Sequence, residues 1–197
     1  MGLTEVEPAC DAILQAWYPG EEGGNAIASV LYGTYNPGGR LPVTFYRSTD
    51  QLPDFEDYSM KGRTYRYMTE KPLYPFGYGL SYSTFKYGKA KLSKKGDKVY
   101  VSVKVKNTSN RDGEEVVQLY VRRPGDTEGP SHALRAFKRT SIPAGKTVTV
   151  QFELTPESFE WFDTNHNVMA TMPGQYEILY GPSSDMNDLK KLKYQIN

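Results

Sequence analysis

Apolar and polar residues alternate along the chain from about residue 85 to its end. A period of two residues is typical of half-buried β-strands, because successive side chains point to opposite faces of a sheet. Clusters of proline, glycine, aspartate and asparagine separate the alternating stretches, as expected for turns. The apolar members of these stretches are Val99, Val101, Val103 and Val105; Val117, Leu119 and Val121; Val148, Val150, Phe152 and Leu154; and Tyr176, Ile178 and Tyr180.

This pattern predicts one antiparallel β-sandwich of about seven strands over residues 84–197. The pair of cysteines that marks immunoglobulin domains is absent from the sequence, so a fibronectin type III-like (Ig-like) sandwich is the better match. A slip of one residue would exchange the two faces of a strand, and the core prediction therefore depends on register. The predicted core residues are Val101, Val103, Val105, Leu119, Val150, Phe152 and Ile178.

Residues 1–50 have a different pattern, which predicts helical turns joined by glycine-rich loops. The residues that share one face of a first predicted helix are Cys10, Ile13, Leu14 and Trp17. A second helix is predicted over residues 25–32, with Asn25 as N-cap and Gly33 as the terminating glycine. One strand is possible over residues 41–45. Elements this few cannot enclose a core, so they need a packing partner.

Residues 51–83 show little periodicity and are rich in aromatic residues. A structureless segment of this length in a compact protein is usually functional or a linker. Its aromatic side chains carry too much apolar area to be exposed together, and we expect the segment to dock on other protein surfaces. The expected anchors are Tyr65, Tyr67, Tyr74, Phe76 and Tyr78.

Charge and cysteine content exclude several classes of function. The 24 basic and 23 acidic residues give a net charge of +1, without the basic excess expected of a nucleic-acid-binding protein. No apolar run is long enough to span a membrane. The tail at residues 190–193 (KKLK) is read as a solvated strand edge. The one cysteine, Cys10, excludes an internal disulfide and is expected to be a small core residue.

Candidate metal and modification motifs are weak. Residues 163–167 (DTNHN) resemble the start of a calcium loop, but Val168 and Gly174 replace the glycine and the glutamate that such a loop needs, so a β-hairpin turn is predicted. His132 and His166 are well separated and have no paired ligands, which argues against zinc. We expect no metal and no cofactor. Asn107 begins a short glycosylation sequon, a motif that also arises by chance.

Four turn-rich runs carry a family resemblance. They are residues 17–26 (WYPGEEGGNA), 35–45 (YNPGGRLPVTF), 62–67 (GRTYRY) and 74–82 (YPFGYGLSY). In this order they resemble the C-terminal part of family 3 glycoside hydrolases, the β-glucosidases and β-xylosidases, and the resemblance covers nearly the whole chain. It implies a mainly β protein with residues 1–50 as the remnant of an α/β sandwich domain, 51–83 as a connecting segment and 84–197 as a fibronectin type III-like domain.

The resemblance also implies that both catalytic carboxyl groups lie upstream of residue 1, so no catalytic residue is assigned. Glycoside hydrolysis needs two carboxyl groups across the scissile bond, whereas Glu21 and Glu22 are adjacent. Glu22 matches a glutamate of the family's glycine-rich turn, and we expect it to hold that loop by accepting backbone hydrogen bonds. If residues 63–67 are extended, Arg63, Tyr65 and Tyr67 share one side and Thr64 and Arg66 the other.

The weak candidates for substrate binding are Glu22, Arg63, Tyr65 and Arg66. For Arg63, Tyr65 and Arg66, a contact between domains is favoured over the rim of a sugar site. The implied parent is a retaining β-glucosidase or β-xylosidase that is periplasmic or secreted and acts on oligosaccharides; the chain alone is expected to be inactive. Its expected partners are the missing domains of the same protein or, by self-association, another copy. The alternative is a free-standing carbohydrate-binding or protein-interaction module.

Overall fold

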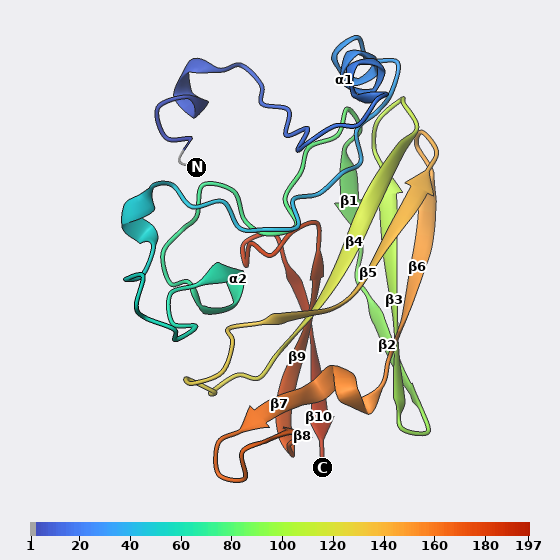
Figure 1. Ribbon diagram of the computed structural model, residues 1–197. Coiled ribbons are helices and arrows are strands. Elements are labelled where there is room, and N and C mark those ends of the chain that lie inside the picture. Colours follow the sequence, from blue (N-terminus) through green and yellow to red (C-terminus); the bar gives the residue numbers. More distant parts are fainter. Residues whose placement is uncertain (1–2) are drawn as a thin grey trace.

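The structure, a computed structural model, describes residues 3–197, and within them two four-stranded antiparallel sheets form a sandwich (Figure 1). In one sheet β3 lies between β6 on one side and β1 and β2 on the other; the other sheet has the order β10-β9-β4-β5. The strands are β1 (Phe85–Tyr87), β2 (Lys91–Lys95), β3 (Lys98–Asn107), β4 (Gly113–Arg122), β5 (Ala133–Ile142), β6 (Thr147–Leu154), β7 (Glu160–Asp163), β8 (Val168–Thr171), β9 (Gly174–Gly181) and β10 (Lys190–Ile196).

The helical elements are short. They are the 3-10 turns η1 (Glu7–Ala9), η2 (Thr49–Gln51) and η3 (Pro156–Phe159) and the α-helices α1 (Gly23–Leu31) and α2 (Thr64–Tyr67). Among the residues that the structure describes, no helix has the length and apolar character needed to cross a bilayer.

The core between the sheets is made by the residues that the alternation predicts. All seven predicted core side chains are buried, from Val101 at 0% exposed to Phe152 at 6%. Every second residue of β3 and β6 points inward, and the register pairs Val101 with Phe152 and Val103 with Val150. The prediction of about seven strands was low. The described chain has two four-stranded sheets, in one of which both β1 and β2 pair with β3, and β7 and β8 form a separate hairpin.

Strands β4 and β9 depart from simple alternation because both of their faces are covered. Tyr120 and Leu179 are as deeply buried as the core residues Leu119 and Ile178, although they point away from the core. The cover is the chain from about residue 34 to residue 83, which runs along the outside of this sheet in Figure 1. The expectation of half-buried strands is therefore wrong for β4 and β9.

The N-terminal region has less helix than predicted. The helix expected at residues 10–17 is absent, and Cys10 is exposed, so its prediction as a core residue was wrong. A short helix is stable when its apolar face packs against something, and nothing in the described chain covers this stretch. The second helix begins earlier than expected, at Gly23, and Glu22 rather than Asn25 occupies the N-cap position. Gly33 follows this helix with φ 74°, the left-handed conformation predicted for it.

Several local predictions can be compared directly with the structure. The strand expected at residues 41–45 is reduced to one bridge between Phe45 and Tyr74. The predicted turn at residues 163–167 joins β7 to β8, and the lysine-rich tail forms the edge strand β10, as expected. Asn107 is fully buried and its amide donates to the backbone of Arg111 and Ile142, so its sequon is inaccessible to a glycan.

We expect Val103→Ala to lower the free energy of unfolding by about 1–3 kcal/mol, because it removes buried methyl groups and leaves a cavity. The measurement is urea denaturation followed by circular dichroism. Lys104→Ala, on the exposed face of the same strand, is the matched control and should change stability little. An unchanged denaturation midpoint in Val103→Ala would contradict the core assignment.

Candidate functional site

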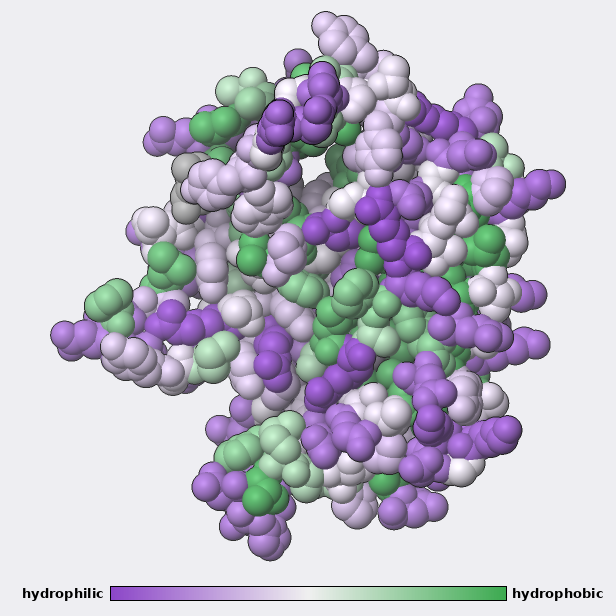
Figure 2. Space-filling model, turned by 45° about the vertical axis from the view of Figure 1, so that its right-hand side comes forward, coloured by the Kyte–Doolittle hydropathy of each residue, from purple (hydrophilic) through white to green (hydrophobic). Residues whose placement is uncertain are grey.

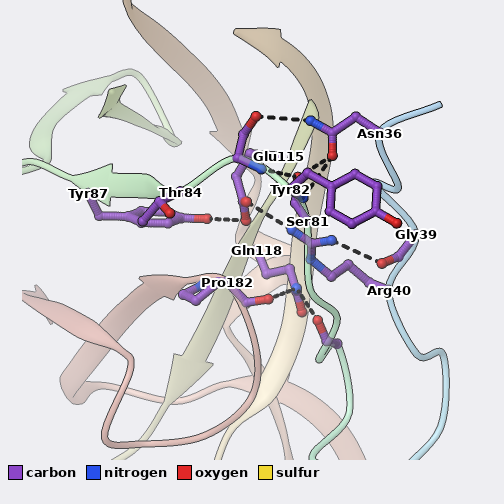
Figure 3. Close-up of polar contacts among 12 residues, drawn as sticks. Asn36, Gly39, Arg40, Ser81, Tyr82, Thr84, Tyr87, Glu115, Gln118 and Pro182 are labelled. Atoms are coloured by element: carbon purple, nitrogen blue, oxygen red, sulfur yellow. Dashed lines mark hydrogen bonds and ion pairs between the residues drawn. The ribbon is translucent and has the colours of Figure 1, made fainter. Parts of the chain in front are cut away.

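A buried ion pair joins the N-terminal segment to the sandwich (Figure 3). Arg40 Nη2 lies 2.8 Å from Glu115 Oε2 on β4, and the two side chains are 7% and 3% exposed. Tyr87 on β1 donates its hydroxyl to the other carboxylate oxygen, Oε1, at 2.9 Å. Arg40 also donates to the carbonyl of Gly39 at 2.9 Å. One carboxylate thus connects both sheets of the sandwich to the loop after α1.

Burial dominates the electrostatics of this group. Burial raises the pKa of Glu115, while the charge of Arg40 and the hydrogen bonds from Tyr87 and Arg40 oppose that rise. Burial and the neighbouring carboxylate also raise the pKa of Tyr87. Glycoside hydrolysis needs two carboxyl groups facing a substrate, whereas Glu115 is a single, enclosed carboxylate whose oxygens both have partners. The arrangement can hold two parts of the chain together but has no room for a sugar.

Asn36 makes a second connection close by (Figure 3). Its side-chain oxygen accepts hydrogen bonds from Ser81 Oγ and from the backbone N–H of Tyr82, both at 2.9 Å. Its amide nitrogen donates to Ser83 Oγ at 2.9 Å and to the carbonyl of Asp112 at 2.8 Å. A single asparagine therefore ties the loop after α1 to the entry of the sandwich.

Gln118, on the outer face of β4, fastens the connecting segment. Its amide donates to the carbonyls of Gly77, at 3.0 Å, and of Pro182, and its oxygen accepts from Tyr120 at 2.6 Å. Gly77 has φ 79°, and a Cβ at that position would lie 2.0 Å from the Gln118 side-chain oxygen. Only glycine fits such a close approach without strain.

Aromatic packing completes the junction. The Tyr65 ring stacks on Phe76 at 4.6 Å between centroids and meets the edge of Tyr120 at 5.8 Å. The Tyr65 hydroxyl accepts a hydrogen bond from the Leu134 backbone at 3.0 Å. These contacts confirm that the connecting segment docks on protein and that Tyr65 and Phe76 are among its anchors.

His132 lies beneath this aromatic group and is held as the neutral ring. Its centroid is 5.2 Å from those of both Tyr65 and Tyr120. Nε2 is 3.0 Å from the carbonyl of Ser184, which can only accept, so Nε2 carries the proton and Nδ1 faces the hydroxyl of Ser131 at 2.8 Å. Burial lowers the pKa of His132 to about 4, with Arg122 adding to the fall and the hydrogen bond to Ser184 opposing it.

The sequence-predicted site residues do not converge on one place. Residues 64–67 form the helix α2, so the two-sided arrangement considered for an extended run does not apply; Thr64 takes a left-handed φ of 55°. Arg63 donates to the backbone carbonyls of Ser59, at 3.0 Å, and of Asp57, and thereby closes its own loop. The Arg66 guanidinium lies 5.6 Å from the Tyr67 ring centre, and its backbone carbonyl accepts from Ser131 at 2.7 Å.

Glu22 lies apart from them, at the start of α1 (Figure 1). Its carboxylate accepts a hydrogen bond from the Asn25 side chain at 2.6 Å, and no bond from a backbone N–H to it is found in the described structure. It contacts the loop that follows it, but not through the backbone hydrogen bonds that we predicted.

A hollow of about 550 Å³ lies on the N-terminal segment. Its aromatic lining includes Trp17, Phe45 and Tyr46, and the Trp17 and Phe45 rings are 6.5 Å apart. Within residues 3–197, no three His, Cys, Asp or Glu side chains are grouped as a metal site would require. The hollow therefore offers apolar and hydroxyl surface rather than a charged reaction centre.

Sequence reasoning missed the residues that build the junction. Glu115 had a readable signal, because it falls in phase with Val117 and Leu119 on the core face of β4. A carboxylate at a core position requires a buried partner. Its partner, Arg40, is 75 residues away in the chain, and no local pattern connects the two.

Comparisons with known proteins agree with this architecture. The family model of the glycosyl hydrolase family 3 C-terminal domain matches residues 1–82, and that of the fibronectin type III-like domain matches residues 115–184. A xylan 1,4-β-xylosidase of Xylanibacter ruminicola is 57% identical over 98% of this chain and 22% of that protein. A periplasmic β-glucosidase of Salmonella typhimurium is 37% identical over 93% of this chain and 26% of that protein.

Solved structures give the same result. β-Glucosidase 3B from Thermotoga neapolitana, in complex with α-D-glucose, superposes with a TM-score of 0.89 at 30% identity, over 100% of this chain and 30% of that one. The chain belongs to the family 3 glycoside hydrolases and corresponds to their C-terminal part. It spans about a quarter of the length of the curated relatives it matches, from 22% to 28%. The family and fold predictions are confirmed.

Removing Arg40 should be much more costly than removing an exposed ion pair. We expect Arg40→Ala to destabilise the chain by about 3–5 kcal/mol, because Glu115 is left charged and buried without its partner. Chemical denaturation measures the loss. Lys98→Ala, which breaks the exposed pair with Glu153, is the control and should change stability little, because solvent screens an exposed pair. Equal effects of the two substitutions would show that the buried pair does not hold the junction.

Stability should fall as the pH falls from about 6.5 to about 4, in part because of His132. In that range the unfolded chain binds a proton at this histidine and the folded chain does not, so acid favours unfolding. The resulting loss in the free energy of unfolding is at most about 3 kcal/mol. His132→Gln keeps a side-chain donor but does not titrate, and should flatten the dependence relative to the wild type. Parallel pH profiles of melting temperature for the two proteins would contradict the assignment.

Proposed function

We propose that the protein to which this chain belongs is a retaining β-glycosidase that removes terminal β-linked glucose or xylose from oligosaccharides. The support is the family and the names of the relatives, a xylan 1,4-β-xylosidase and β-glucosidases. A retaining reaction uses a carboxylate nucleophile and a carboxyl acid/base about 5 Å apart. No such pair faces a common cavity in residues 3–197, and we assign both groups to the remainder of the protein.

In this proposal the chain itself is structural. One observation carries the argument: the N-terminal segment is bonded to the sandwich on one side and exposes large apolar side chains on the other. These are Ile13, Leu14, Trp17 and Val43, which are 41–51% exposed. Apolar surface of this kind is normally covered. We infer that residues 1–50 complete an α/β sandwich domain, that residues 51–83 connect it, and that residues 84–197 act as the platform.

The four candidate residues for substrate contact fit supporting roles. We propose that Arg63 shapes the loop before α2 and that Tyr65 and Arg66 hold this helix against β5, on the contacts to Leu134 and Ser131. Glu22 is exposed at the tip of its turn, and we propose that it orders this turn through Asn25. None of these roles requires a sugar.

The proposal predicts that the chain lacks activity alone but restores it to a truncated relative. The partner is the Xylanibacter ruminicola xylosidase without the region matched here, which we expect to be inactive by itself. Mixed with this chain, it should hydrolyse nitrophenyl β-xyloside, because both carboxyl groups are then present in a supported fold. The relative's own matched region is the positive control. Hydrolysis by the pure chain, abolished in Glu22→Gln, would overturn the proposal.

The exposed apolar side should also make the chain associate with itself. We expect concentration-dependent dimers or larger species by light scattering, since an uncovered apolar surface finds another copy most readily. Trp17→Ser with Val43→Thr should shift the equilibrium toward monomer, while Phe137→Ser, an exposed aromatic residue on β5, should not. A wild-type chain that stays monomeric at high concentration would contradict the expectation.

A further inference from the structure

The outward face of the sheet formed by β1, β2, β3 and β6 is lined with lysines. The even-numbered residues of β3 point away from the core, and the register places their neighbours on the same face. We call this surface the lysine face; its members are Lys86 on β1, Lys91 and Lys95 on β2, and Lys98, Lys104 and Lys106 on β3. Hydrophilic side chains project from the side of the molecule on which these strands lie (Figure 2).

Two carboxylates oppose these six lysines, and both act on Lys98: Glu153 on β6 and Asp97 in the turn between β2 and β3. Of the outward positions on these four described strands, one holds a carboxylate, Glu153, which pairs with Lys98. The remaining outward residues of β6 are polar and uncharged: Thr147, Thr149 and Gln151. The surface therefore carries a strong local positive charge although the chain as a whole is nearly neutral, at +1.

Two pairs of lysines are directly opposite each other in the register. Lys86 faces Lys106, and Lys95 faces Lys98. Like charges at such positions destabilise a sheet. Lysines on edge strands can protect against aggregation, but β3 has partners on both sides, so edge protection does not account for Lys98, Lys104 and Lys106. A binding role explains lysines whose placement lowers stability.

The lysine face is also well placed to remain open. The connecting segment covers the outside of β4 in the other sheet, through contacts of Gly77 with Gln118 and of Tyr65 with Tyr120. The apolar side that needs a cover belongs to residues 1–50, with Trp17 and Val43. The lysine face lies on the opposite side of the sandwich and is free to meet a large ligand.

We propose that the lysine face binds an anionic polysaccharide, one that carries uronate groups along a chain of sugars. Lysine presents a point charge on a flexible stem, which suits single contacts with carboxylates spaced along a sugar chain. The threonine and glutamine side chains of β6 offer hydrogen bonds to sugar hydroxyls. Membrane surfaces usually also require inserted apolar residues, and none of the large exposed apolar side chains lies on these four strands.

The test uses the whole chain and two acidic probes, polygalacturonate and xylan bearing glucuronate side groups, with unsubstituted xylo-oligosaccharides as the neutral probe. Calorimetry at low salt should detect binding of the acidic probes, and added salt should weaken it. The triple variant Lys86→Gln, Lys104→Gln, Lys106→Gln should bind about tenfold more weakly, or worse. The matched control is Lys61→Gln, Lys71→Gln, Lys138→Gln, which removes the same charge from exposed lysines elsewhere and should bind like the wild type.

A second measurement separates loss of the site from loss of the fold. Because Lys86 and Lys106 repel each other, the single variant Lys86→Gln should melt at the same temperature as the wild type or higher at low salt, and the difference should vanish at high salt. The proposal is overturned if the acidic probes do not bind, or if the triple variant binds them as the wild type does. Equal binding of phosphatidylglycerol vesicles or duplex DNA would also overturn it, because it would show unselective attraction to any polyanion. None of these outcomes depends on glycosidase activity.

Discussion

The Arg40–Glu115 pair is the contact on which the arrangement of the whole chain depends. A charged carboxylate inside a protein is costly unless it is paired and its remaining oxygen is hydrogen-bonded. Glu115 meets both conditions, but only when the loop carrying Arg40 lies against β4 and Tyr87 on β1 approaches from the other sheet. The pair therefore requires the N-terminal segment to be docked. Asn36 and Gln118 extend the same constraint along the outside of the sheet.

This constraint makes the two faces of the sandwich unequal. Strands β4 and β9 are buried on both sides, and the outer residues Gln118 and Tyr120 of β4 act as attachment points rather than as solvated positions. The sheet that contains β3 keeps one face in solvent, where lysines collect. On β4 the outer residues Gln118 and Tyr120 mark the contact with the connecting segment, whereas the charged outer residues of β3 mark an open surface.

The N-terminal segment and the sandwich together correspond to one part of a larger family of enzymes. The similarity to the C-terminal part of the family 3 glycoside hydrolases extends through both the N-terminal segment and the sandwich. The segment is too poor in regular structure to stand alone, and the sandwich holds it in shape while leaving Trp17 and Val43 exposed. In the proposed structural role, a platform of this kind supports catalysis by fixing the position of what packs on it.

The sequence by itself determined the sandwich, its core and its family, because period-two alternation and glycine-rich turns are local properties that survive without context. Val101 to Val105 are buried as the pattern requires, and Gly33 ends its helix as predicted. Only the tertiary structure decided which outer face was covered, whether residues 10–17 were helical and how residues 64–67 were folded. These outcomes depend on contacts between residues far apart in the chain, such as Arg40 with Glu115 and Tyr65 with Leu134. A short stretch of sequence does not show which distant residue will make such a contact, so it cannot predict the energy that the contact contributes.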